Sequence, residues 1–265
     1  MKKNFVILGC GNMTSALFSN GAPAGDFAFK CYTPTMKRAE DLVAKIGGEI
    51  LQELNFKSPD VLFLGHKPQN FSEIAESINK NVSSDTLVIS IQAAISVEQI
   101  QKKLGTKKVI RLMPNTPVSL KKGVVLFFAS SEVSEFDKKM VMDWLNGISL
   151  VANLKSEKVF DEATVITGSG PGLIFEIAKT FQKHLLDLGI SEKEAQKLVA
   201  QTFLGSGQMM LSETDLTTLQ NQVTSKNGVT NAALEEWRKK SIAEILKSGF
   251  SSAIARGTEI ASSLK

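Results

Sequence analysis

Two glycines near the start of the chain are placed for phosphate chemistry. Gly9 and Gly11 follow an apolar run, Phe5–Gly9, that is typical of a strand, and helical spacing follows them. Glycine at a strand-to-helix turn permits the tight turn and lets the backbone approach a pyrophosphate at the helix N-terminus. The spacing predicts a dinucleotide-binding turn, although the third position of the usual pattern holds Thr14. The alternative is an ordinary glycine turn.

The residues after the second expected strand indicate which dinucleotide would bind. A site for NAD usually carries Asp or Glu there, about 20 residues after the glycines, to hold the ribose 2′-hydroxyl. No carboxylate occupies this place in the chain, which instead offers hydroxyls and cations that suit a 2′-phosphate. We therefore predict NADP as the cofactor, bound by Thr33, Thr35, Lys37 and Arg38. The alternative is a solvated start of a helix.

The first half of the chain alternates apolar runs with helical spacing. Such alternation favours a parallel, doubly wound sheet of the Rossmann type, and near-continuous apolar runs are typical of strands covered on both faces. The expected strands are Phe5–Gly9, Phe27–Tyr32, Val61–Gly65, Thr86–Ile91, Lys108–Met113 and Val124–Ala129. The helical segments between them include Arg38–Ile46, Asn70–Asn79 and Val97–Leu104.

After about Leu154 the pattern becomes helical throughout. The expected helices are Gly170–Leu188, a helix from Ser191 to about Leu211, Asn231–Leu246 and Ser251–Ser262. Their apolar stripes need a partner face, which makes a lone monomer an unfavourable arrangement. We predict an α/β protein with a Rossmann domain over residues 1–154 and an all-α domain over 155–265, joined by a short linker near Asn153–Glu157.

Composition excludes several classes of function. The net charge of +4 comes from scattered lysine pairs, so nucleic acid is not an expected partner. Cys10 and Cys31 have no metal-ligand spacing, and no metal site is predicted. No apolar run is long enough to span a bilayer, and the N-terminal run is too short for a signal peptide. Together these features favour a cytoplasmic protein without a membrane partner.

Four segments resemble one family, the pyrroline-5-carboxylate reductases. They follow the family's order across almost the whole chain, and the third is the most specific. The segments are Gly9–Ala16 (GCGNMTSA), Lys67–Gln69 (KPQ), Arg111–Pro117 (RLMPNTP) with Gly123 after it, and Thr167–Pro171 (TGSGP).

The resemblance implies a fold, an activity and a set of site residues. The fold is a Rossmann domain followed by an all-α dimerisation domain, in a homodimer or larger homo-oligomer. The activity is reduction of 1-pyrroline-5-carboxylate, a small imine carboxylate, to L-proline with NADPH, in proline biosynthesis. The further cofactor-binding residues that it implies are Asn12, Met13, Lys67, Pro68, Pro114 and Asn115, the last four near the nicotinamide. His66 stands where the family usually has a small apolar residue, and we expect a hydrogen-bonded local residue there.

The family's last signature resembles V-x-S-P-G-G-x-T, and Val223–Thr230 matches it in part. Lys226 and Asn227 replace the proline and the first glycine, in the loop that grips the substrate carboxylate in the family. Other departures are Gly172-Leu173 after Pro171, where the family commonly has Ala-Tyr, and Ala93-Ala94, where Ala-Gly is usual. These departures leave the exact imine substrate open.

The loop before Asn231 is the expected substrate site. Its backbone N–H groups, from Gly228, Val229 and Thr230, would form a helix N-terminal site for the carboxylate, and Ser225 would add a hydroxyl. Hydride transfer to an imine needs mainly proximity, because the cofactor carries the chemistry. The Thr230 hydroxyl is the candidate catalytic group, bonded to the substrate nitrogen; its alternative role is that of a plain N-cap.

Three other functions share the same layout. A β-hydroxyacid dehydrogenase would place a proton-transferring lysine four residues after Gly170, where this chain has Ile174, which argues against alcohol chemistry. A paralogue that binds NADP and turns over little or no substrate would be compatible with the Lys226-Asn227 departure, as would a reductase of a related cyclic imine. Turnover of NADPH with pyrroline-5-carboxylate distinguishes these possibilities.

Overall fold

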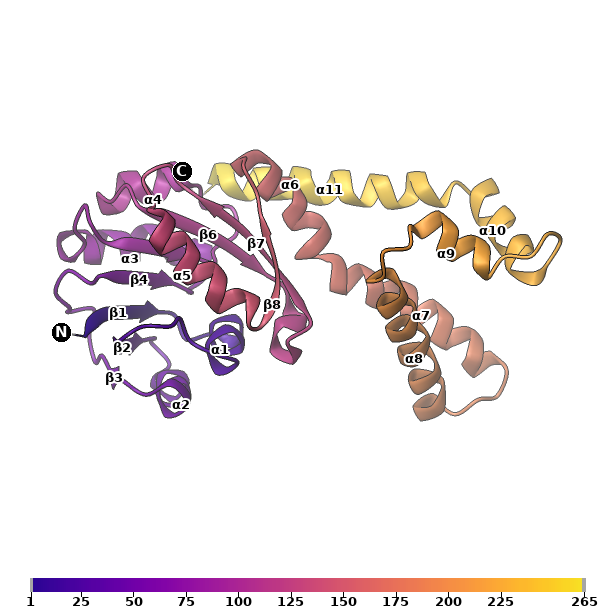
Figure 1. The fold of residues 1–265 in the computed structure, drawn as a ribbon, viewed down its shortest axis with the longest axis horizontal. Coiled ribbons are helices and arrows are strands. Elements are labelled where there is room, and N and C mark those ends of the chain that lie inside the picture. The colour runs from indigo at the N-terminus through magenta and orange to yellow at the C-terminus, as the bar shows by residue number, and fades with distance from the viewer. Residues whose placement is uncertain (1, 264–265) are drawn as a thin grey trace. The chain divides into compact units, whose positions relative to one another are not determined.

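The computed structural model describes residues 2–263, which form two compact units. One unit contains the residues up to Pro171 together with those from Ala253 onward, and the other is Gly172–Ser252. Figure 1 shows strands only in the first unit and helices alone in the second. The sequence predicts a domain boundary between residues 154 and 155, and this boundary stays a prediction.

An eight-stranded sheet forms the centre of the first unit, in the order β3-β2-β1-β4-β5-β6-β7-β8. All neighbours are parallel except β6 and β7, which are antiparallel. The short 3-10 turn at Thr116–Leu120 joins these two strands, and a connection of this length cannot make a parallel crossover. The strands are β1 (Lys3–Leu8), β2 (Phe27–Tyr32), β3 (Glu49–Ile50), β4 (Val61–Leu64), β5 (Leu87–Ser90), β6 (Val109–Pro114), β7 (Gly123–Ala129) and β8 (Ser149–Asn153).

Helices cover both faces of this sheet, which confirms the doubly wound prediction (Figure 1). Successive residues of a strand point to opposite faces. Phe5 and Ile7 of β1 therefore join the core under α1, α2 and α5, whereas Val6 and Leu8 join the core under α3 and α4. These helices are α1 (Asn12–Ser19), α2 (Met36–Ile46), α3 (Phe71–Ile78), α4 (Val97–Leu104) and α5 (Glu135–Asn146).

Helix α6 (Glu157–Thr167) is fastened to β6 at both of its ends. Arg111, 1% exposed, donates from Nη1 to Glu157 Oε1 at 2.6 Å and from Nη2 to Asp161 Oδ1 at 2.8 Å. Asn115 donates from Nδ2 to the carbonyl of Thr167 at 3.0 Å. Four strand residues span about 13 Å and ten helical residues about 15 Å, so the helix lies along the strand.

The middle of this contact is apolar. Met113 of β6 and Phe160 of α6 are buried in one cluster, and the Arg111 guanidinium lies 4.6 Å from the centre of the Phe160 ring. Arg111, Met113 and Asn115 therefore use alternate positions of one strand to hold one helix. Leu112 points to the other face and packs in the larger core.

The second unit contains most of the remaining helices, which are α7 (Gly170–Asp187), α8 (Glu192–Met210), α9 (Leu216–Gln222), α10 (Val229–Lys239) and α11 (Ile242–Ser263). Gly189 has φ +84° after α7, and the Ser191 side chain caps α8, the helix that the sequence predicts to start there. The predicted helix Asn231–Leu246 is wrong as one element. Ser241 has φ +55° and separates α10 from α11, which then continues without a break to Ser263.

Several elements lack a clear sequence pattern. The edge strands β3 and β8 are short and partly exposed, with Leu150 of β8 65% exposed, so neither shows the apolar run of a central strand. Helices α5, α6 and α9 were likewise not among the expected helices. The predicted linker falls between β8 and α6, both of which belong to the first unit.

Replacement of Arg111 by Ala should lower the free energy of unfolding by about 3 kcal/mol, because it removes a buried guanidinium with two carboxylate partners. Urea denaturation at fixed protein concentration measures the change. Lys139→Ala removes an exposed ion pair with Asp143 and should cost less than about 1 kcal/mol. Equal effects of the two substitutions would contradict this account of the β6–α6 contact.

Candidate functional site

The predicted dinucleotide turn lies at the carboxyl end of β1, where the strand order changes direction between β2 and β4. Gly9 has φ +95°, and a Cβ there would lie 2.7 Å from the Cα of His66. Gly11 is the N-cap of α1, and a Cβ there would meet nothing within 4 Å. No side chain caps α1, so the N-cap residue offers its first N–H groups no side-chain acceptor. This cradle fits a pyrophosphate.

Thr14, which departs from the usual glycine pattern, has a structural role. It is fully buried and its hydroxyl donates to the carbonyl of Gly9 at 2.7 Å. A Cβ at Gly65, the residue after β4, would overlap this hydroxyl and would lie 2.6 Å from the Gly9 carbonyl oxygen. Thr14 therefore fixes the turn from within the helix, and Gly65 is required because the hydroxyl occupies the space.

The residues predicted to bind a 2′-phosphate lie around the start of α2. Thr33 is buried, and Thr35 is the N-cap of α2 but makes no capping hydrogen bond. The Lys37 ammonium lies 2.8 Å from Asp41 of the same helix, which raises the pKa of Lys37. Arg38 is exposed and has no ion pair among residues 2–263. Arg38 is therefore the cation that remains available to an anionic ligand.

Lys67 and Pro68 lie at the same edge of the sheet, after β4. Pro68 begins a 3-10 turn at Pro68–Asn70, and Lys67 is exposed at its start. The backbone here is held by Gln92, 2% exposed, which donates from Nε2 to the His66 carbonyl at 3.2 Å. The sequence patterns did not single out Gln92, since only the three-dimensional pairing of β4 with β5 brings it to this place.

His66 contradicts its prediction as a hydrogen-bonded residue. Both ring nitrogens are buried, and neither makes a hydrogen bond of acceptable geometry within the described chain. Burial lowers the pKa of His66 to about 4, and the backbone carbonyl of Leu8 offsets part of this effect. The imidazole is therefore neutral near pH 7.

Pro114 and Asn115 end β6 at the same edge, and the Asn115 amide is used internally. Its Oδ1 accepts from the backbone N–H of Val124 at 2.9 Å, and its Nδ2 donates to Thr167. Asn115 is 9% exposed. In this structure the Asn115 side chain holds β7 and α6 in place. If Asn115 lies near the nicotinamide, as predicted, its amide therefore also positions the elements around the cofactor.

The predicted substrate loop precedes α10 in the second unit. Asn227 has φ +59°, a left-handed conformation that Asn tolerates better than most residues. Gly228 is the N-cap of α10, and no side chain caps this helix. Thr230 is therefore not the N-cap, which excludes its plain structural alternative, and its side chain is exposed. Ser225 accepts from the Gly228 N–H at 2.9 Å through its carbonyl, which leaves its hydroxyl outside this bond.

The structure thus gathers the predicted cofactor residues at one edge of the sheet and places the predicted substrate residues in the helical unit. Asn12 and Met13 open α1 beside the glycines. Among residues 2–263, no group of three or more His, Cys, Asp or Glu could hold a metal ion. None of the described helices combines the length and the apolar character needed to cross a membrane.

Comparisons with known proteins point to one family. Residues 157–260 match the family model for pyrroline-5-carboxylate reductase dimerisation, and residues 4–94 match the model for NADP oxidoreductase, coenzyme F420-dependent. The chain is 30% identical to the pyrroline-5-carboxylate reductase of Vibrio alginolyticus, over 97% of each protein. It is 29% identical to that of Pseudomonas aeruginosa, over 97% of this chain and 96% of the relative.

Solved structures give the same result. The pyrroline-5-carboxylate reductase of Coxiella burnetii superposes with a TM-score of 0.85 at 26% identity, over 98% of each chain. The Plasmodium falciparum pyrroline carboxylate reductase with NADP bound gives 0.83 at 23% identity, again over 98% of each chain, a likeness of fold.

The buried His66 predicts a specific acid sensitivity. Its pKa falls from 6.5 to about 4 on folding, so the unfolded chain binds the proton first and stability is lost as the pH falls through this interval. Between pH 7 and pH 4.5 this group should account for about 2 to 3 kcal/mol of the loss. His66→Ala should therefore lose less stability than the parent over that interval in urea denaturation.

The matched control is His184→Ala, which removes the other histidine, an exposed one on α7. The acid loss of each variant is subtracted from that of the parent protein. The prediction fails where His66→Ala loses as much stability as the parent between the two pH values.

Proposed function

The chain belongs to the pyrroline-5-carboxylate reductase family, and we propose that it reduces 1-pyrroline-5-carboxylate to L-proline with NADPH. The near full-length match to enzymes of this name supports the activity. The NADP oxidoreductase match over residues 4–94 supports the cofactor. The reaction adds a hydride to the imine carbon and a proton to the imine nitrogen.

The observation that carries this proposal is the capping of the helices. Side chains of Ser96, Ser134, Ser156, Ser191 and Asp215 cap α4, α5, α6, α8 and α9. Helices α1, α2, α3 and α10 have no side-chain cap. Three of these four, α1, α2 and α10, are the helices at which the pyrophosphate, the 2′-phosphate and the substrate carboxylate are expected. Free N–H groups at a helix N-terminus bind such anions.

In the proposed reaction the chain mainly binds and orients. Bound NADPH supplies the hydride. The amides at the start of α1 hold the pyrophosphate, and Arg38 holds the 2′-phosphate. The amides of Val229 and Thr230, with the Ser225 hydroxyl, hold the substrate carboxylate. The Thr230 hydroxyl donates a hydrogen bond to the neutral imine nitrogen and relays to it a proton from solvent water, which gives the iminium. Positioning of this kind supplies much of the rate, since an iminium carbon already accepts hydride readily.

The Lys226-Asn227 departure is compatible with this role. Asn227 adopts the left-handed conformation that favours the family's glycine, so the turn into α10 keeps a shape that glycine would also allow. Lys226 is exposed and adds a positive charge beside the proposed carboxylate site. A positive charge here favours an anionic substrate, which supports a reductase over a paralogue that has lost its substrate.

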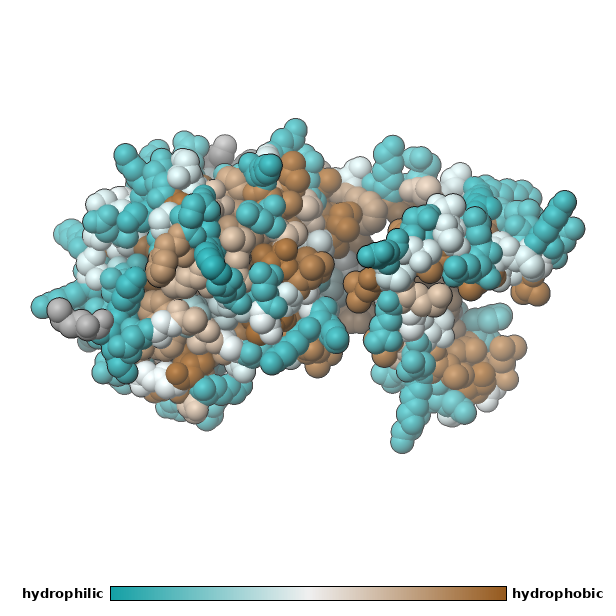
Figure 2. All heavy atoms as spheres, in the orientation of Figure 1, coloured by the Kyte–Doolittle hydropathy of each residue, from teal (hydrophilic) through white to brown (hydrophobic). Residues whose placement is uncertain are grey.

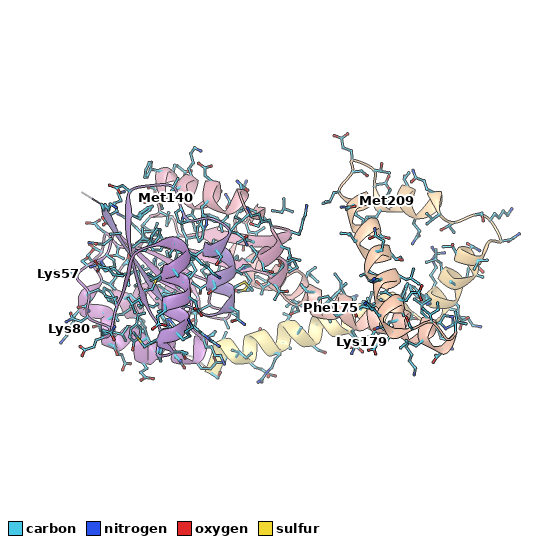
Figure 3. All side chains as sticks on the ribbon, turned by 90° about the horizontal axis from the view of Figure 1, so that it is seen from below. Lys57, Lys80, Met140, Phe175, Lys179 and Met209 are labelled. Carbon is cyan, nitrogen blue, oxygen red and sulfur yellow. The ribbon has the colours of Figure 1, made fainter. Side chains whose placement is uncertain are left out.

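We propose further that the protein works as a homodimer or larger homo-oligomer in the cytoplasm. Helices α7, α9, α10 and α11 contain no buried residue among the described positions. Figure 2 shows apolar side chains gathered on the surface of the helical unit. Phe175 of α7 and Met209 of α8 project from their helices (Figure 3) and are 64% and 48% exposed. Exposed apolar area of this extent needs a partner. The free thiols of Cys10 and Cys31 suit a reducing compartment.

Replacement of Thr230 by Ala should reduce kcat for pyrroline-5-carboxylate by roughly 10- to 100-fold, because it removes the group bonded to the reacting nitrogen. Oxidation of NADPH, followed by its absorbance, measures the rate. Thr230→Ser should retain most of the activity. Thr217→Ala is the matched control, because Thr217 is also the second residue of an exposed helix, α9.

An unchanged kcat in Thr230→Ala would remove Thr230 from the mechanism. A parent protein that binds NADPH but turns over no cyclic imine would overturn the proposed function and favour the non-catalytic paralogue.

Replacement of Arg38 by Ala should weaken NADPH binding by roughly 10- to 100-fold and leave NADH binding unchanged, because a charge-assisted bond to the 2′-phosphate is lost. Calorimetric titration of both nucleotides measures the two affinities. Lys37→Ala should have the smaller effect, since Asp41 already pairs with its ammonium. Equal losses for NADPH and NADH would contradict a 2′-phosphate contact.

A further inference from the structure

His66 differs from the other described side chains in that both of its polar atoms are buried without a well-formed hydrogen bond. Both Nδ1 and Nε2 are shielded from water and make no hydrogen bond of acceptable geometry within the described chain, although the Leu8 carbonyl interacts with the ring. Arg111, the other described residue with such an atom, leaves only Nε unpaired. Burying a polar atom without a partner costs free energy, and such a group in a folded protein needs a reason. The reductase mechanism proposed above uses no group at this position.

The place of His66 in the sheet suggests that reason. It follows β4 by two residues, and β4 and β2 flank β1 on opposite sides. A dinucleotide lies across the carboxyl ends of the strands at this reversal, with its adenosine half over the second strand. The β4 side therefore faces the nicotinamide half. The backbones of His66 and Gly9 also lie close together, and the imidazole interacts with the carbonyl of Leu8, the residue before the phosphate-binding turn.

The main chain around His66 is held firmly. Gly65 donates its N–H to the Leu8 carbonyl at 2.7 Å, and Gln92 binds the His66 carbonyl. The Gln92 side chain is itself bonded to the Ser90 hydroxyl at 3.3 Å. The imidazole is therefore the part of this segment that can change its orientation. A half-turn about Cβ–Cγ exchanges each nitrogen with a ring carbon and leaves the ring volume unchanged.

The protonation state of the ring selects its partner. Burial lowers the pKa of His66 to about 4, so near pH 7 the ring offers one N–H donor and one acceptor nitrogen. A ribose diol offers the complementary pair of hydroxyls. A phosphate would instead favour a charged imidazolium, and the pyrophosphate already has the amides at the start of α1.

We propose that His66 binds the nicotinamide-side ribose of the dinucleotide, through a hydrogen bond between its imidazole and a ribose hydroxyl. This inference rests on the proposed function for the identity of the dinucleotide. It adds a cofactor contact that is specific to this chain, because the resemblance predicts a small apolar residue at the position.

The first test uses the full-length protein labelled with ¹⁵N-histidine. The chain has only two histidines, so His184 on α7 serves as the reference within the same sample. Saturation with NADP⁺ should shift the His66 ring nitrogen signals and slow the exchange of its N–H with water. The His184 signals should stay in place. Unshifted His66 signals in a sample that calorimetry shows to be saturated with NADP⁺ would overturn the proposal.

The second test separates a ribose contact from damage to the turn. His66→Ala should weaken binding of NADP⁺ by roughly 10-fold, the effect of one lost hydrogen bond. It should leave binding of adenosine 2′,5′-bisphosphate unchanged, because this probe lacks the nicotinamide ribose. His66→Gln, which keeps a donor and an acceptor, should recover part of the affinity, and His184→Ala should bind both ligands as the parent does.

Each outcome of the second test decides the matter. Equal weakening of both ligands would show a structural role for His66, and no weakening of either would show no contact, so both results overturn the proposal. None of these measurements requires turnover. A protein that binds NADP⁺ as described but reduces no cyclic imine would lose the proposed reductase function and keep this contact.

Discussion

The buried guanidinium of Arg111 on β6 fixes α6, the helix that follows the last strand of the sheet. Arg111 stays charged at any physiological pH, so it is stable inside the protein only while Glu157 and Asp161 remain beside it. That requirement fixes the first turns of α6, and the Asn115 amide fixes its last turn. Because α7 begins three residues after α6 ends, the same strand also fixes the residues that immediately precede α7.

The same requirement explains the most specific motif in the sequence. The alternate residues Arg111, Met113 and Asn115 all face α6, and Leu112 between them faces the opposite core. Glu157 also accepts from the N–H of Val97 at 2.8 Å, which ties the start of α4 to the same ion pair. A segment that resembles a signature of the family thus has an architectural role in this structure, because three of its residues hold α6.

The central strands β4, β5 and β6 could be predicted from the sequence because they are buried on both faces. The observed bounds of β2 also match the prediction, although this strand is only partly buried. The edge strands β3 and β8 could not be predicted, since half-exposed strands lack that pattern. The break at Ser241 had no signal either, because serine is not a residue type that marks a left-handed backbone position. The glycines of the phosphate turn were evident from spacing. The roles of Thr14, Gly65 and Gln92 were not, because they arise where separate strands meet.

In the loop before α10, the backbone conformation depends on Asn227 and the positive charge comes from the neighbouring Lys226. Position 227 has a left-handed backbone, which restricts it to the few residue types that tolerate such a conformation. Position 226 is exposed and carries no such restriction. A substitution at position 226 can therefore change the charge of this loop while the left-handed turn at position 227 keeps the path of the backbone.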